Sequence, residues 1–111
     1  MNPQKNKGDK AEREVAALLS ELTGKTVRRK LGAGRSNASG GDTGDIEGIP
    51  NFAIQVADWK NKNAACLQKP TEAEDQRINL GVDHAATFVR FRGGRYRVVL
   101  TPEQFIRLVN G

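Results

Sequence analysis

The sequence predicts one α/β domain in which a mixed β-sheet is flanked by helices. Its 111 residues suit a single domain with one modest core. Segments with helical and with strand periodicity follow one another in the order helix, strand, hairpin, helix, hairpin, helix. No internal repeat interrupts this order, and the polar residues 1–8 are expected to form a flexible arm.

The first helix is expected to begin with Asp9 as its N-cap and to end at Gly24. Glu12 lies three residues after Asp9, which is the capping-box position, so a purely structural role is one interpretation of this acid. A strand is expected over residues 26–31, and a glycine-rich loop follows it. The helical spacing that predicts the first helix is that of Ala11, Val15, Leu18 and Leu22.

Residues 44–60 are expected to form a hairpin with its turn at residues 49–51. In its second strand, large apolar residues alternate with smaller or polar ones, so Gln55 points away from the apolar side chains. The turn would bring Asp45 and Gln55 together. Two oxygen-bearing side chains at strand ends are what a hard cation such as Mg²⁺ needs.

The C-terminal half is expected to hold a helix over residues 71–80, started by a capping box after Pro70 and ended by Gly81. A Gly-Gly turn then joins two strands, and Thr101 caps a last helix. The arginines of this hairpin would face one another on a solvated edge or bind an external anion. The expected pairs are Phe91 with Tyr96, Val89 with Val98, Arg92 with Arg95, and Arg90 with Arg97.

The excess positive charge lies in the first third of the chain. Residues 1–35 hold nine Lys or Arg against four acids, whereas residues 36–111 hold nine of each. This balance favours a polyanionic partner, although a solvated basic surface is the alternative. Small residues in the glycine-rich loop would let a backbone approach phosphates, although a simple connector has the same composition. The expected phosphate-contacting residues are Arg28, Arg29, Lys30, Arg35, Ser36 and Asn37.

Several classes of protein are disfavoured by the sequence. No apolar run approaches membrane-spanning length and no signal-peptide pattern is present, so we expect a soluble, cytoplasmic protein without a membrane partner. Cys66 is the single cysteine and cannot form an internal disulfide. His84 is the single histidine, so neither a zinc site nor a serine-type triad is supported.

Two segments of the chain together resemble the PD-(D/E)XK nuclease superfamily. One is the hairpin, with Asp45, Gln55 and position 57, and the other is Gly-Asp-Lys-Ala-Glu-Arg-Glu at residues 8–14. Their order and spacing are most similar to those of Holliday junction resolvases and their phage relatives, over residues 8–60. The resemblance implies a restriction-endonuclease-like core and Mg²⁺- or Mn²⁺-dependent hydrolysis of phosphodiester bonds in branched DNA such as four-way junctions. It also implies a homodimer, located in the host cytoplasm if the chain is encoded by a phage.

The same resemblance implies a role for each site residue. Asp45 would be the main metal ligand, and Gln55 a neutral carbonyl ligand. Glu12 would bind the metal directly or through water, and the backbone carbonyl of Val56 would complete the set. These residues would place a cation beside the scissile phosphate.

Two positions depart from the family pattern. Gln55 replaces an acid, and Ala57 stands where the family has its lysine, so we expect this chain to be impaired. Lys60 is the next cation along the chain, but in an extended strand it would point to the other face. Whether Ala57 is natural or engineered stays open at this stage. So do three alternatives: a nickase or repair endonuclease of the same fold, a non-catalytic nucleic-acid-binding module, and a small interaction domain.

Overall fold

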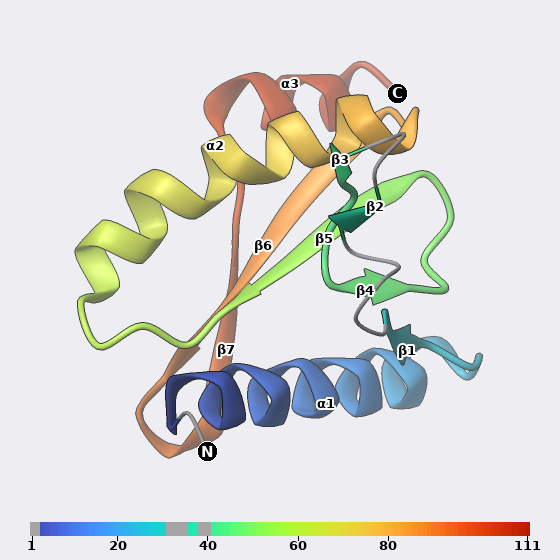
Figure 1. Cartoon of the computed structure of the whole chain (residues 1–111). Coiled ribbons are helices and arrows are strands. Elements are labelled where there is room, and N and C mark those ends of the chain that lie inside the picture. The colour runs from blue at the N-terminus through green and yellow to red at the C-terminus, as the bar shows by residue number, and fades with distance from the viewer. Residues whose placement is uncertain (1–2, 31–35, 38–40) are drawn as a thin grey trace.

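The structure is a computed structural model that describes residues 3–30, 36–37 and 41–111, with side chains from residue 8 onward outside the gap at 31–40. A mixed five-stranded sheet has the order β1-β4-β5-β6-β7, and β2 and β3 form a separate pair. Helices pack against the large sheet (Figure 1), which confirms the predicted α/β class. The elements are α1 (Pro3–Thr23), β1 (Arg28–Arg29), β2 (Ser36–Asn37), β3 (Gly41–Asp42), β4 (Ile46–Glu47), β5 (Phe52–Ala57), α2 (Lys62–Leu80), β6 (His84–Phe91), η2 (Arg92–Gly94), β7 (Arg95–Val99) and α3 (Pro102–Val109).

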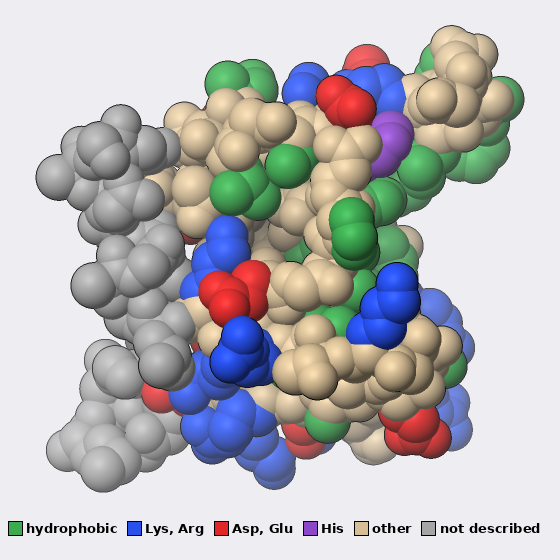
Figure 2. Space-filling model, turned by 90° about the vertical axis from the view of Figure 1, so that its right-hand side faces the viewer, with side chains coloured by type: hydrophobic (Ala, Val, Ile, Leu, Met, Phe, Trp, Pro, Cys, Tyr) green, Lys and Arg blue, Asp and Glu red, His purple; other side chains and the backbone are tan. Residues whose placement is uncertain are grey.

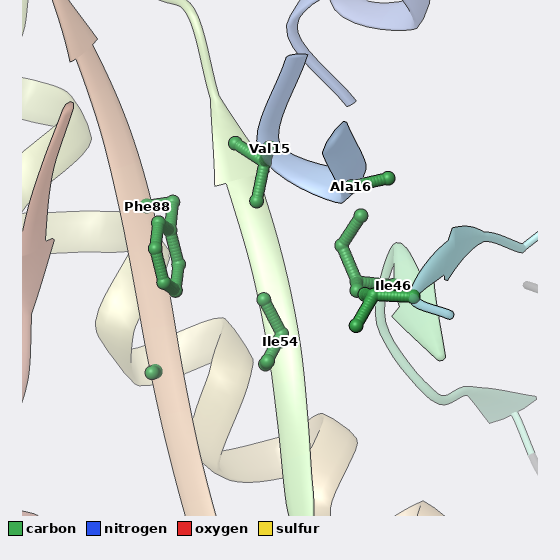
Figure 3. Packing of buried hydrophobic residues seen from close by; sticks show 7 residues of the cluster. Val15, Ala16, Ile46, Ile54 and Phe88 are labelled. Carbon is green, nitrogen blue, oxygen red and sulfur yellow. The ribbon is translucent and has the colours of Figure 1, made fainter. Parts of the chain in front are cut away.

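Strand β5 is the centre of the fold. It pairs with β4 in antiparallel and with β6 in parallel orientation. Helix α1 packs on one face of β5, where Val15 and Ile54 share a core cluster (Figure 3). Helix α2 covers the opposite face, where Ala65 contacts Ala57. Both faces of β5 are therefore inside the protein, and the alternation in its sequence separates two cores rather than a core from solvent.

The predicted hairpin over residues 44–60 is confirmed, with its turn at residues 50–51. The preceding strand is shorter than expected, because only Arg28 and Arg29 pair with β4. The last helix also begins where the sequence placed it. The Thr101 hydroxyl accepts a hydrogen bond from the Gln104 backbone N–H at 3.1 Å, as an N-cap does.

The start of α1 was predicted too late. The helix begins at Pro3, so residues 3–8 are helical where an arm was expected, and Asp9 is not an N-cap. Proline is tolerated in a first helical turn because it lacks only an N–H that has no partner there. Asp9 instead lies within the helix and makes an ion pair with Arg29 at 3.1 Å. The end at Gly24 is confirmed by its positive φ of 71°.

The start of α2 was also predicted too late. The helix begins after Asn61, whose side-chain oxygen accepts the Ala64 backbone N–H at 3.0 Å, and not at Thr71. Pro70 lies inside the helix and is buried. The packing of α2 along β5 and β6 offsets the backbone hydrogen bond that this proline removes. The predicted end at Gly81 is confirmed by a left-handed cap.

The register of the C-terminal hairpin differs by one residue from the prediction. The turn has three residues, Arg92–Gly94, rather than two. A one-residue slip moves every side chain of a strand to the other face. The arginines therefore do not face one another as two pairs. The observed partners are Phe91 with Arg95, Arg90 with Tyr96, Val89 with Arg97, and Phe88 with Val98.

Glu14 joins this hairpin to α1. Its Oε1 accepts hydrogen bonds from Arg90 Nε at 2.8 Å and from the Tyr96 hydroxyl at 2.6 Å. The hydrogen bonds from Arg90 and Tyr96 hold the pKa of Glu14 below its ordinary value. Burial and the Glu14 carboxylate raise the pKa of Tyr96.

No helix within the described residues combines the length and apolar character needed to cross a membrane.

We predict that Glu14→Gln lowers the free energy of unfolding at pH 7 by about 1 to 2 kcal/mol, because charged hydrogen bonds are lost at a partly exposed site. Since the folded pKa of Glu14 is lowered, its contribution is complete above the ordinary value of 4.5 and disappears as the pH falls through the folded pKa. Urea unfolding between pH 7 and pH 3 measures this difference. Glu21→Gln, exposed on the same helix, is the matched control. An unfolding difference for Glu14→Gln that stays constant with pH would refute the ionic role.

Candidate functional site

Asp45 is fixed where β4 meets β5. Its backbone N–H donates to the Ile54 carbonyl at 2.8 Å, and its own carbonyl accepts the Lys30 N–H at 2.8 Å. Its carboxylate Oδ2 accepts the Val56 backbone N–H at 2.9 Å. The carboxylate is thus bound to the residue next to Gln55, and the two predicted site residues are brought together. Fixed polar groups of this kind can hold a ligand without further rearrangement.

The residues before Asp45 are packed closely against the neighbouring strands. Gly44 has a φ of +100°, and a Cβ at this position would lie 2.9 Å from the Ile54 carbonyl oxygen. Thr43 is buried, and Lys30 Nζ donates to its carbonyl at 2.8 Å and to its hydroxyl at 2.9 Å. Burial lowers the pKa of Lys30, although nearby carboxylates oppose this shift. Lys30 therefore anchors the segment from within, rather than lying on the surface as a phosphate contact.

Asp42 connects the same segment to α2. Its Oδ2 accepts a hydrogen bond from Gln76 Nε2 at 3.0 Å, and its Oδ1 accepts the Gly44 N–H at 2.9 Å. Asn79 Nδ2 donates to its backbone carbonyl at 2.9 Å. The two contacts with α2 were not expected from the sequence, because Gln76 and Asn79 are more than 30 residues away from Asp42 in the chain. Helix α2 thus helps to position Asp45.

Gln55 is 4% exposed and points toward α2. Its Nε2 donates to Glu72 Oε1 at 3.2 Å, whereas its Oε1 has no hydrogen-bond partner among the described residues. The neighbour of Gln55 on β6 is Thr87, whose hydroxyl oxygen is likewise buried without a described partner. A buried carbonyl oxygen without a partner is costly, so this oxygen is suited to a water molecule or a cation.

Glu72 is a site residue that the sequence did not reveal. One carboxylate oxygen contacts Gln55, and the same oxygen lies 3.1 Å from Lys69 Nζ. Its side chain is 47% exposed, so it can move between these partners and solvent. The sequence predicts only a capping box in the segment that contains Glu72, and so no role at this site. Its position became visible once α2 was seen to pass through this region as one continuous helix.

Glu12 is buried, and its carboxylate shares the Arg29 guanidinium with Asp9. Glu12 Oε1 lies 3.5 Å from Arg29 Nε, and Asp9 lies on the other side of the same guanidinium. Across residues 3–30, 36–37 and 41–111, no group of three or more His, Cys, Asp or Glu side chains could hold a metal ion.

Ala57 occupies a core position. It is 2% exposed and packs against Ala65 and Val89, between β5 and α2. A lysine here would lie between β5 and α2, two residues along the strand from Gln55 and on the same face. Lys60 is exposed in the connection after β5. No described contact places Lys60 beside Gln55 or Asp45.

The structure describes only some of the other residues that were predicted to contact phosphate. The Arg28 side chain is 74% exposed and lies 3.9 Å from Glu47. Arg35 and the side chains of Ser36 and Asn37 lie outside the described residues. Figure 2 shows Lys and Arg side chains, together with a few acids, in the lower half of the face near β1. Arg29 is largely neutralised by its two acids.

A separate apolar groove of about 230 Å³ opens between α1 and α3. It is visible as the hollow at the right of Figure 2, where hydrophobic side chains reach the surface. Four large apolar residues of α3 are exposed beside it: Phe105, Ile106, Leu108 and Val109. The residues that line the groove are Leu19, Ile49, Phe52, Ile54, Ala86, Phe88, Val98, Leu100 and Leu108.

We predict that Gly44→Ala lowers the free energy of unfolding by about 3 to 4 kcal/mol, because the new methyl group is both strained and pressed against the Ile54 carbonyl. Gly24→Ala is the control, since Gly24 also has a positive φ but has no other atom within 4 Å of the added Cβ. The control should lose only about 1 to 2 kcal/mol. Urea unfolding compares the two variants. Equal losses would show that close packing at Gly44 does not constrain Asp45.

None of the family models, curated proteins and solved structures compared with this chain matches it.

Proposed function

We propose that this chain is a PD-(D/E)XK-type endonuclease with a restriction-endonuclease-like fold, built to cut branched DNA with Mg²⁺ or Mn²⁺. One observation carries the proposal: the Asp45 carboxylate accepts the N–H of Val56, the residue after Gln55, and Gln55 Oε1 is buried without a partner among the described residues. The mixed sheet flanked by helices is compatible with it. A carboxylate and a carbonyl oxygen next to each other suit a hard cation.

The donor set fits a weakly held cation. Asp45 would supply the negative charge, and the amide oxygen of Gln55 and the carbonyl of Val56 would supply neutral ligands. Glu72 would be available as a further carboxylate, because it already contacts the Gln55 side chain. A bound divalent cation would neutralise phosphate charge and activate water. The chain itself contributes the fixed position of Asp45, and one acid fewer than the family pattern weakens the site.

The position of Ala57 explains why the chain would be a poor catalyst. An alanine supplies no charge beside the attacking water, and its methyl group is packed against Ala65. Lys30 does not replace it, because its ammonium is bound to Thr43. Lys60 is exposed on the connection that follows β5. The proposed enzyme would therefore cut slowly without a lysine at position 57.

The packing of Ala57 also favours a second candidate, a non-catalytic nucleic-acid-binding module. In this case the protein would bind DNA through its basic surface, and Asp45 would serve only to join β4 to β5. The two candidates differ in what loss of the Asp45 charge does. Without the Asp45 charge, a binding module would still bind DNA and function unchanged, whereas a nuclease would lose its cleavage activity.

Cleavage assays on a four-way junction, a nicked duplex and a linear duplex test the proposal with Mg²⁺ or Mn²⁺. We predict that Ala57→Lys raises the rate on the junction at least a hundredfold, as expected for a catalytic proton-transfer or charge-stabilising group. Adding Asp45→Asn should abolish this gain. Preferential cutting of the nicked duplex would instead indicate a repair or nicking enzyme of the same fold.

Ala57→Met is the matched control, because methionine has a similar length and the same packing cost but no charge. Circular dichroism verifies that all variants are folded. If no variant cuts any substrate, while all bind the junction equally, the binding-module candidate replaces the nuclease.

We further propose that two copies pair through the apolar groove and α3. A twofold dimer needs one surface that complements itself, and here a groove and protruding apolar side chains lie side by side on the same face. The exposed Leu108 belongs to both, so the two features form one continuous apolar surface. A symmetric dimer would present two sites to the two equivalent strands of a junction.

We predict that Phe105→Lys combined with Leu108→Lys converts a dimer into a monomer of 12.1 kDa. Light scattering coupled to size-exclusion chromatography measures the mass. Leu67→Lys is the control, because Leu67 is 77% exposed on α2, away from the groove. A monomeric unchanged chain, or a dimer that survives both lysines, would exclude this pairing surface.

A further inference from the structure

A second hollow, of about 360 Å³, lies at the turn between β6 and β7. The described residues that line it are Phe91, Arg92, Arg95 and Arg97, and no acid is among them. All three arginines are exposed. In Figure 1 this turn lies at the end of the sheet next to the N-terminal half of α1.

The hairpin register explains why the guanidinium groups gather there. Arg95 pairs with Phe91, and Arg97 pairs with Val89, so both arginines lie on the face that α2 covers further along the sheet. Arg90 lies on the opposite face, where it bonds to Glu14. The observed register therefore separates Arg90 from Arg97 and gathers the other arginines of the hairpin around the Phe91 ring.

The charges of this hollow are not neutralised within the described part of the chain. Arg29, Arg90 and Arg107 each make an ion pair with an acid. Among the described residues, no acid makes an ion pair with an arginine of the hollow. Arg97 donates a hydrogen bond to the Tyr96 carbonyl at 2.8 Å.

One more cation lies at the border of the hollow. Lys62, in the first turn of α2, lies 5.7 Å from the centre of the Phe91 ring and pairs with Asp58 at 3.6 Å. The cost of holding three like charges together favours an external anion that would offset their repulsion.

The hollow lies at the same end of the sheet as the site. Ala57 follows Gln55 by two residues and pairs with Val89, and Phe91 follows Val89 by two residues. Phe91 is thus separated from Gln55 by four residues along the strands and by one strand spacing across them, a diagonal of about 14 Å. This distance corresponds to about four base-pair steps of a duplex. A DNA backbone held at the hollow would therefore lie within a few nucleotides of Gln55.

We propose that this arginine hollow, formed by Arg92, Arg95 and Arg97 around Phe91, binds the phosphates of a DNA arm next to the one being cut. The proposal rests on the proposed function, and it selects the external anion from the two roles that the sequence left open for the arginines of this hairpin. Guanidinium groups suit the task because their fork of donors matches two phosphate oxygens. These contacts would supply affinity and orientation, and they would not read the base sequence.

Binding of a labelled four-way junction as a function of salt tests the proposal. We expect that replacing all three arginines by Gln weakens binding at least tenfold at low salt. The slope of log K against log salt should become shallower by about 2 to 3, since fewer counterions are released. Replacing them by Lys is the matched control and should keep most of the salt dependence.

Further outcomes separate this inference from the proposed function. Unchanged binding by the Gln variant overturns the arginine hollow alone, while junction cleavage by Ala57→Lys would still support the nuclease. Absence of any DNA binding by the unchanged chain removes both. Competition by inorganic phosphate or by poly-glutamate as effective as competition by duplex DNA would also overturn the assignment to a nucleic-acid backbone.

Discussion

The burial of β5 on both faces is the constraint on which the rest of the structure depends. Helix α1 covers one face and α2 covers the other, so every side chain of this strand must fit a packed environment. Small residues face α2, and larger ones face α1. Gln55 is the polar exception, and its buried position makes the pairing of its amide group energetically important.

This constraint connects the candidate site to the fold. Asp45 is fixed because Gly44, the residue before it, packs tightly against the Ile54 backbone of β5. Lys30 and Gln76 hold the preceding residues Thr43 and Asp42 from two sides. The amide of Gln55 then meets Glu72, because α2 passes directly above it. The same packing encloses Ala57. The close packing that positions Asp45 therefore also restricts the space at position 57, where a lysine would be needed.

The sequence predicted the α/β class, the hairpin that brings Asp45 to Gln55, and the helix ends at glycines, since each depends on local periodicity or turn chemistry. It missed the starts of α1 and α2, because tertiary packing extended both helices past their apparent caps. The predicted register of the arginine hairpin was wrong by one residue, because its turn has three residues rather than two. Glu72 and the anchoring role of Lys30 depend on distant contacts, which no local pattern contains.

Binding of Mn²⁺ observed by NMR on the ¹⁵N-labelled chain tests most directly whether Asp45 and Gln55 form a cation site. The paramagnetic ion broadens the amide signals that lie close to it. We predict that the signals of Asp45, Gln55 and Val56 broaden first, and that Asp45→Asn removes this effect. Broadening centred on exposed acids such as Asp83 or Glu103, with these three signals unchanged, would contradict the metal-dependent nuclease and leave Asp45 with a structural role.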